Sequence, residues 1–305
     1  MNKAVIIDTD PGIDDAVALG IGLFSDQLDV KLITTVAGNV GIKYVTENML
    51  KLLTFWNLKI PVAQGAAGPL LREVKDASDI HGVTGMAGYE FPTPNRSCLL
   101  EESAVEAMHR TLMASAEKMT IIAIGPLTNI ALLLKTHPEV KERIEELVLM
   151  GGALGRGNFG ILSEFNIAID PEAAKIVFES GLSLAGAPLD VGLKALVYPE
   201  DSEKIKDMNQ TGDMMYHLFK KYRSGSFGTG LKMYDSCALA YVLCPEMFEI
   251  KETFVAVETK GEYTSGATII DLNNKLGKEK NCRVCVDVDE NKFKEWFLHA
   301  ISQCK

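Results

Sequence analysis

The apolar residues of this chain recur in short runs that predict alternating strands and helices. Residues 4–7 are typical of a buried parallel strand, and residues 16–24 of a helix that follows it. Further strands are predicted at 30–36, 61–63, 119–124 and 147–150, with helices at 42–55 and 102–117 and another opened by 125–129. Repeated strand–helix units of this kind indicate a mostly parallel sheet covered on both faces and joined by right-handed crossovers.

The second half of the chain keeps the mixed pattern. Helices are predicted near 202–208, 213–222 and 236–243, alternating β segments at 254–258 and 282–288, and a closing amphipathic helix at 291–301. Residues 65–97 are rich in Gly, Pro and polar side chains and predict a long irregular excursion. Because no linker, repeat or low-complexity tract interrupts the chain, we expect one α/β domain over residues 1–305, an open Rossmann-like sheet flanked by helices.

Polar residues follow the predicted strands. Residues 8–15 hold four aspartates, and Asn39, Asn129, Glu164 and Asn166 follow later strands. Ligands of open parallel sheets bind beyond the carboxyl ends of the strands, so we expect the active site at that edge.

The four aspartates stand where the first strand turns into a helix. Asp10 occupies an expected N-cap position and Pro11 the first helical position. Capping accounts for one or two acids, but four neighbouring carboxylates repel one another unless a cation or protons neutralise them. A hard divalent metal bound through carboxylate oxygens is our interpretation, and an acid-rich helix cap is the alternative.

The composition of the chain limits the classes of molecule that we expect it to bind. The 305 residues carry a formal net charge of −10, which argues against a nucleic acid or an anionic membrane as the main partner. No apolar run approaches the ~18 residues that span a bilayer. The first strand begins almost at Met1 and the six cysteines show no second zinc-ligand pair, so we expect no signal peptide, buried free thiols and a cytoplasmic location.

Taken together, these motifs resemble the inosine–uridine-preferring nucleoside hydrolase family, and within it the bacterial non-specific ribonucleoside hydrolases. The segment DTDPGIDDA at 8–16 matches the family's N-terminal signature, and six further segments follow in family order. These are TTVAGN (34–39), HG (81–82), GPLTN (125–129), VLMGG (148–152), EFNI (164–167) and DPEAA (170–174).

The resemblance implies a calcium-dependent hydrolysis of ribonucleosides to ribose and free base. It assigns Asp10, Asp15, Asp235 and the carbonyl of Ile124 to Ca²⁺, and Asp14 to the role of general base on the metal-bound water. Asn39, Glu164 and Asn166 match ribose-binding positions, Met150 and Asn158 line the sugar pocket, and His81 lies near the base. Relatives form dimers or tetramers, so a homodimer or homotetramer is expected.

One departure from the family concerns the leaving group. Where the family usually has a histidine before the last metal-binding aspartate, this chain has Tyr234. A phenol can still donate a hydrogen bond, although its ordinary pKa near 10 makes it a weaker acid than histidine. His81 is a second candidate for the acid. Two smaller departures, Thr84 and Gly192, receive no role from the sequence.

Aromatic side chains could stack on the nucleobase. The candidates are Phe165, Tyr222, Phe227 and Tyr234.

The sequence leaves two alternative functions. A nucleoside-binding protein with weak or lost turnover is one alternative, because Tyr234 replaces the usual histidine. A haloacid-dehalogenase-type phosphatase with Asp8 as nucleophile is the other, although it leaves Asp14 and Asp15 unexplained.

Overall fold

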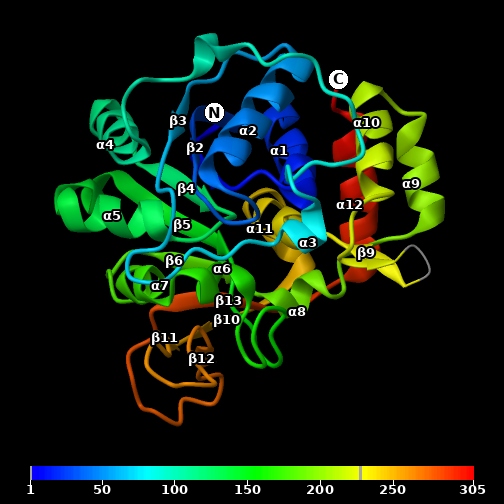
Figure 1. Ribbon diagram of the computed structural model, residues 1–305. Helices are drawn as coiled ribbons and strands as arrows, with labels where there is room; N and C mark the ends of the chain where they lie inside the picture. Colours follow the sequence, from blue (N-terminus) through cyan, green and yellow to red (C-terminus); the bar gives the residue numbers. More distant parts are fainter. Residues whose placement is uncertain (1, 227–228) are drawn as a thin grey trace.

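A computed structural model describes residues 2–226 and 229–305, and these residues are organised around an eight-stranded sheet (Figure 1). All adjacent strands pair in parallel except the antiparallel pair at one edge. From that edge the order is β10 (Phe248–Thr253), β13 (Cys282–Val288), β6 (Leu184–Ala187), β5 (Ile144–Met150), β4 (Met119–Ala123), β1 (Lys3–Thr9), β2 (Leu28–Thr35) and β3 (Val62–Gln64). The expected α/β architecture with a mostly parallel open sheet is confirmed.

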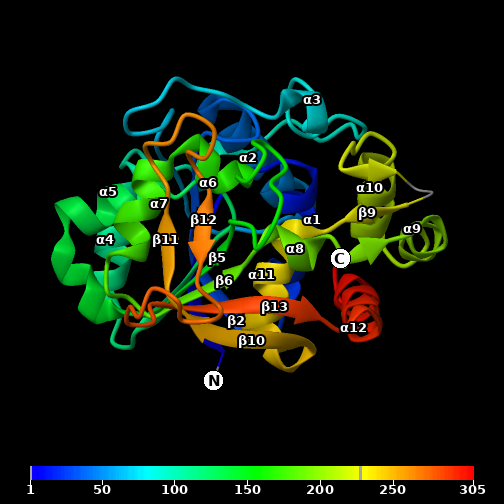
Figure 2. The same cartoon turned by 90° about the horizontal axis from the view of Figure 1, so that it is seen from below.

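Helices cover both faces of the sheet, as Figures 1 and 2 show. Along β1, Val5 and Ile7 pack into one hydrophobic core and Ile6 into the other, because successive strand residues point to opposite faces. The first core contains α1 (Ile13–Phe24), α2 (Ile42–Trp56), α10 (Gln210–Phe219), α11 (Tyr234–Leu243) and α12 (Glu290–Ser302). The second contains α4 (Ala104–Ala114), α5 (Thr128–Thr136) and α7 (Pro171–Phe178).

The start of α1 differs from the expectation that Asp10 caps it. The helix begins at Ile13 with Gly12 as N-cap, so Pro11 lies before the first turn. The carboxylate of Asp10 instead accepts the backbone N–H of Asn39, at 2.6 Å. Asp15, in the first turn, accepts the N–H groups of Gly12 and Asp10 at 2.9 and 3.2 Å and so does the capping.

Shorter elements connect these strands and helices. The excursion after β3 is largely irregular, as expected, and contains the single turn α3 (Ser78–His81). The others are η1 (Arg96–Cys98), η2 (Pro138–Arg143), α6 (Phe165–Ile169), α8 (Leu189–Gly192), β7 (Leu196–Val197), α9 (Pro199–Lys206), β8 (Gly225–Ser226), β9 (Gly230–Lys232), η3 (Pro245–Met247), β11 (Val255–Val257) and β12 (Thr268–Ile270).

The strand β10 is not indicated by the sequence pattern. It carries the exposed charged residues Glu249, Lys251 and Glu252, which are typical of a strand at the edge of a sheet, where they discourage pairing with another chain.

Among the described residues, no helix has the length and apolar character needed to cross a lipid bilayer.

Candidate active site

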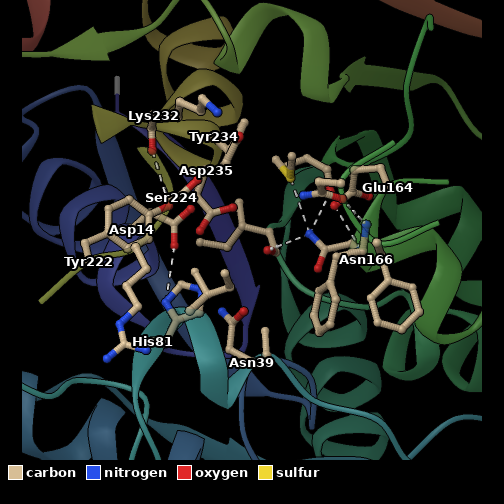
Figure 3. Close-up of a pocket in the computed structure, with 18 of the residues that line it drawn as sticks. Asp14, Asn39, His81, Glu164, Asn166, Tyr222, Ser224, Lys232, Tyr234 and Asp235 are labelled. Atoms are coloured by element: carbon tan, nitrogen blue, oxygen red, sulfur yellow. Dashed lines mark hydrogen bonds and ion pairs between the residues drawn. The ribbon is translucent and has the colours of Figure 1, made fainter. Parts of the chain in front are cut away.

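A cavity of about 490 Å³ opens where the carboxyl ends of the central strands meet α3, α6 and the start of α11 (Figure 3). Its size suits a small organic ligand. It brings together residues that lie far apart in the sequence. The predicted site residues that line it are Asp14, Asn39, His81, Ile124, Met150, Asn158, Glu164, Phe165, Asn166, Tyr222, Tyr234 and Asp235. Phe227, another predicted base-stacking residue, lies outside the described residues.

Three carboxylates form an acidic group on one side of the cavity. Oxygens of Asp14, Asp15 and Asp235 lie within 4.8 Å of one another, and all three side chains are buried. The first two belong to the first turn of α1 and the third to the first turn of α11. The positive ends of two helix dipoles therefore face this negative group.

Burial and mutual repulsion raise the pKa values of these acids. Burial raises the pKa of Asp14 to about 6. The pKa of Asp235 is raised well above its ordinary value, first by burial and then by the charges of Asp14 and Asp15. Three ionised carboxylates at this spacing require a compensating cation. The described residues therefore contain a possible acidic metal-binding group.

Asp10 and Asp15 lie beneath the cavity and are almost completely buried. Asp15 is fixed by the hydroxyl of Thr9 at 2.7 Å and the Asn39 side-chain amide at 2.8 Å. Oδ1 of Asp10 has no hydrogen-bond partner among the described residues. A Cβ built on Gly125 would lie 2.7 Å from this oxygen, so the glycine leaves it open. An unpaired buried carboxylate oxygen beside an acidic group fits a divalent cation.

The opposite wall is built on the N-terminus of α6. The carboxylate of Glu164 caps this helix and accepts the N–H groups of Gly152 and Asn166, each at 3.0 Å. Burial raises its pKa to about 7. The side-chain amide of Asn166 donates to the carbonyls of Ile124 and Met150, both at 3.1 Å, and so joins the ends of β4 and β5.

The remaining predicted sugar-site residue, Asn158, stands beside this wall. Its side-chain oxygen accepts the backbone N–H of Phe165 at 2.9 Å. The Phe165 ring meets that of Phe159 edge to face, with centroids 5.5 Å apart. This contact holds an aromatic surface at the cavity lining.

His81 closes the cavity from the side of α3. Its Nδ1 accepts the N–H of Ile13 at 3.0 Å and lies 3.9 Å from Oδ1 of Asp14. Its ring lies 5.5 Å from that of Tyr222, centroid to centroid. Burial lowers the pKa of His81 to about 4, so the imidazole is neutral near pH 7.

Two tyrosines form the wall between His81 and the start of α11. The hydroxyl of Tyr222 donates to the carbonyl of Lys232 at 3.2 Å. The phenol of Tyr234 is largely buried, and burial raises its pKa to about 12. At neutral pH both phenols therefore keep their protons and can act as hydrogen-bond donors.

Several lining residues have no signal in the sequence. They are Asp76, Ala77, Asp79, Ile80, Phe159, Arg223, Ser224 and Lys232. A guanidinium nitrogen of Arg223 donates to the carbonyl of Asp79 at 3.3 Å, which ties the loop after α10 to α3. These residues lie in loops and in the short elements α3 and β9, where no motif or periodicity singles them out.

A second group of possible metal ligands lies away from the cavity. His109, His137 and Glu139 bring ligand atoms together, with imidazole–carboxylate distances of 3.1 and 3.4 Å. The two rings stack at 3.9 Å with an angle of 15° between their planes. In-plane lone pairs of nearly parallel rings do not converge on one ion, so we assign no metal here.

Comparison with known proteins gives matches over almost the whole chain. Residues 5–295 match the family described as inosine-uridine preferring nucleoside hydrolase. The non-specific ribonucleoside hydrolase RihC of Salmonella paratyphi C is 51% identical over 298 residues, which is 98% of this chain and 97% of that protein.

Solved structures agree with this match. A purine-preferring ribonucleoside hydrolase from Gardnerella vaginalis superposes with a TM-score of 0.91 at 29% identity, over 98% of each chain. An inosine-guanosine nucleoside hydrolase superposes with a TM-score of 0.92 at 28% identity, over 100% of each chain.

Proposed function

This chain belongs to the inosine-uridine preferring nucleoside hydrolase family, and we propose that it converts purine and pyrimidine ribonucleosides to ribose and free base in the cavity described above. Members of this family are enzymes that hydrolyse N-glycosidic bonds. The observation that carries the proposal is the pairing of an acidic group on one wall with sugar-directed polar groups on the other. Asp14 and Asp235 face Glu164 and Asn166 across a space suited to a nucleoside.

Calcium is the cofactor that we propose. Asp10, Asp15, Asp235 and the carbonyl of Ile124 would hold it, and the unpaired Oδ1 of Asp10 supports this ligand set. Ca²⁺ accepts six to eight oxygen ligands in a flexible geometry, which leaves room for water and ribose hydroxyls. When bound, the ion would orient the attacking water and lower its pKa.

Asp14 acts as the general base. It reaches the cavity beside the proposed ligands Asp15 and Asp235, and its pKa of about 6 leaves it mostly ionised at pH 7. A base with a pKa just below the working pH accepts a proton efficiently. Asp14 takes one proton from water as the water oxygen bonds to the anomeric carbon and the bond to the base breaks.

Asn39, Glu164 and Asn166 orient the ribose, with Met150 and Asn158 lining the sugar pocket. Backbone N–H groups of Gly152 and Asn166 fix the Glu164 carboxylate, so its position is set before substrate arrives. Orientation of this kind lowers the barrier by several kcal/mol when the reacting atoms are held in line. The positive charge that develops on the sugar ring is stabilised by the acidic wall.

The departing base needs a proton or hydrogen-bond donor and a stacking surface. Tyr234 is the proposed donor, and the Nε2–H of His81 is a second one. Phe165 and Tyr222 offer aromatic faces that accept any base, which fits a site that recognises ribose first.

The two alternative functions make different demands. Asp8 is fully buried and accepts hydrogen bonds from Thr34 and Asn129, so it cannot serve as the nucleophile of a phosphatase. A binding protein without turnover would keep the ribose contacts but release no product.

Ribose release from a panel of ribosides tests the proposal. With calcium present, we expect reducing sugar from inosine or uridine and no phosphate from 4-nitrophenyl phosphate. Binding of nucleosides without release of ribose would replace hydrolysis with the binding function. Phosphate release would favour the phosphatase.

We also propose a cytoplasmic homodimer or homotetramer that acts on small nucleosides and binds neither nucleic acid nor membrane. The net charge of −10 supports the last two points. Light scattering after size exclusion chromatography measures the number of chains in the assembly.

A further inference from the structure

Gly192 lies directly against the ring of Tyr234. Gly192 is the last residue of α8, which follows β6, and Tyr234 is the first residue of α11. A Cβ built on Gly192 would lie 2.2 Å from Cδ1 and 3.0 Å from Cε1 of the tyrosine. Real Cβ atoms do not approach a neighbour this closely, so any side chain at position 192 must displace the ring or separate the two helices.

The backbone does not explain this glycine. Gly192 is absent from the described glycines with positive φ, so an alanine could adopt its conformation. Gly192 is also buried. The feature that distinguishes it is therefore the space that its missing side chain leaves for the ring.

The position of that ring matters because Tyr234 lies in the cavity wall beside the acidic group. Figure 3 shows Tyr234 and Asp235 projecting from the start of the same helix, across the cavity from Glu164 and Asn166. A Cβ on Gly192 would also lie 3.2 Å from the Cα of Tyr234, and turning the ring about its Cβ–Cγ bond does not relieve that contact. Relief by rotation about the Cα–Cβ bond or by a shift of the start of α11 moves the hydroxyl away from its hydrogen-bonding position.

We propose that Gly192 is a positioning residue for departure of the base, and that Gly192 and Tyr234 form a matched pair. This inference rests on the proposed nucleoside hydrolysis. The missing side chain at 192 sets the phenol where it gives its proton to the leaving base, while water supplies the hydroxyl added to the sugar and Asp14 receives the water's proton. Transfer of that proton from Asp14 through solvent then restores the phenol. The contact between Gly192 and the ring of Tyr234 is the observation that supports this pairing.

The first experiment compares leaving groups in Gly192→Ala. Inosine and uridine require donation to the base, whereas 4-nitrophenyl riboside releases a stable anion that requires none. We expect kcat for inosine and uridine to fall about 10²-fold, the lower end of what a positioned acid contributes. We expect kcat for 4-nitrophenyl riboside to change less than about 3-fold if only this donation is lost. Equal losses on all three substrates would show a merely structural glycine and overturn the proposal.

Gly186→Ala is the matched control. Gly186 is a buried glycine of β6, and a Cβ built on it meets Cys282 and Leu149 at 3.8 and 3.9 Å, which is ordinary contact. We expect this variant to retain its kcat on all three substrates. A leaving-group-dependent loss in Gly186→Ala as well would remove the special role of position 192.

A double-mutant cycle with Tyr234→Ala asks whether Gly192 acts through the ring. With alanine at 234, Gly192→Ala should cause no further loss of kcat on inosine and only a small change in Tm. With tyrosine at 234, Gly192→Ala should lower both kcat on inosine and Tm. If Gly192→Ala had the same effect on kcat with tyrosine and with alanine at position 234, Gly192 would not act through the ring and the proposal would be overturned.

The two readouts also separate this inference from the proposed function. If the wild-type enzyme released no ribose from any riboside, the proposed function and the positioning role would both fail, while coupling in Tm would still establish the steric contact. If ribose is released and the coupling appears in Tm but not in kcat, hydrolysis stands and the positioning role fails.

Discussion

Nδ1 of His81 accepts a hydrogen bond from the backbone N–H of Ile13, at 3.0 Å. A backbone N–H can only donate, so Nδ1 carries no proton and the neutral ring holds its proton on Nε2. Burial lowers the pKa of His81 to about 4 and favours this neutral form. His81 is therefore available to a bound substrate as a neutral hydrogen-bond donor and not as an imidazolium acid.

The first prediction is that His81 does not titrate between pH 5 and pH 8. Its imidazole NMR signals should stay constant over that range. His81→Gln identifies the signals by their disappearance. A midpoint near 6.5 for His81 would contradict the neutral state and restore an imidazolium as a candidate acid.

The second prediction separates activity from stability at Asp14. Asp14→Asn should lower kcat by about 10²-fold or more, because the base that accepts the water's proton is gone. In chelator the same variant should be at least as stable as the wild type, because one of three neighbouring buried carboxylates has lost its charge. Ribose release and thermal unfolding measure the two effects. A variant with near-normal kcat would exclude Asp14 as the base.

The sequence predicted most of the sheet because its strands are buried on both faces and read as apolar runs. The rule that ligands bind at the carboxyl ends of parallel strands also identified Asn39 and Glu164 as site residues, and both line the cavity. That these side chains bind ribose stays a prediction.

The start of α1 was predicted wrongly because a distant partner outcompeted a local one. Asp10 has the residue type and position of an N-cap, but its carboxylate accepts the N–H of Asn39. In the same way, Ser224 and Arg223 enter the cavity through a loop whose path depends on packing against α3. Contacts between residues that are distant in the sequence cannot be predicted from local sequence patterns.

The third prediction concerns pH and the buried Asp8. Oδ1 of Asp8 accepts hydrogen bonds from Thr34 and Asn129, whereas its Oδ2 has no hydrogen-bond partner among the described residues. Burial raises the pKa of this carboxyl group from 3.8 to about 7. Between these two pH values the folded state binds a proton that the unfolded state has released. Stability from Asp8 is therefore complete below about pH 4, declines as the pH rises, and is lost above about pH 7.

Asp8→Asn tests this in chelator. Wild-type Tm should fall from pH 5 to pH 8 more steeply than the Tm of the variant, which has no proton to lose at this position. Parallel pH profiles would show that Asp8 is ionised in the folded protein throughout this range.

The fourth prediction compares leaving groups at Tyr234. Tyr234→Phe keeps the ring and removes the hydroxyl, so kcat for inosine and uridine should fall about 10²-fold or more while kcat for 4-nitrophenyl riboside is little affected. Tyr234→His restores a hydrogen-bond donor and should change the ratio of the kcat values for the three substrates. An unchanged ratio in both variants would exclude Tyr234 from departure of the base.

We propose that carboxylates from distant parts of the chain, Asp10 and Asp15 near the N-terminus and Asp235 at the start of α11, hold one cation that hydrolysis requires. The most direct test of this proposal is the rate of ribose release from inosine by chelator-treated enzyme as calcium is added back. We expect a rate near zero in chelator, saturable recovery with Ca²⁺, and no recovery in Asp235→Asn at the same calcium concentrations. A full rate in chelator would contradict the proposal.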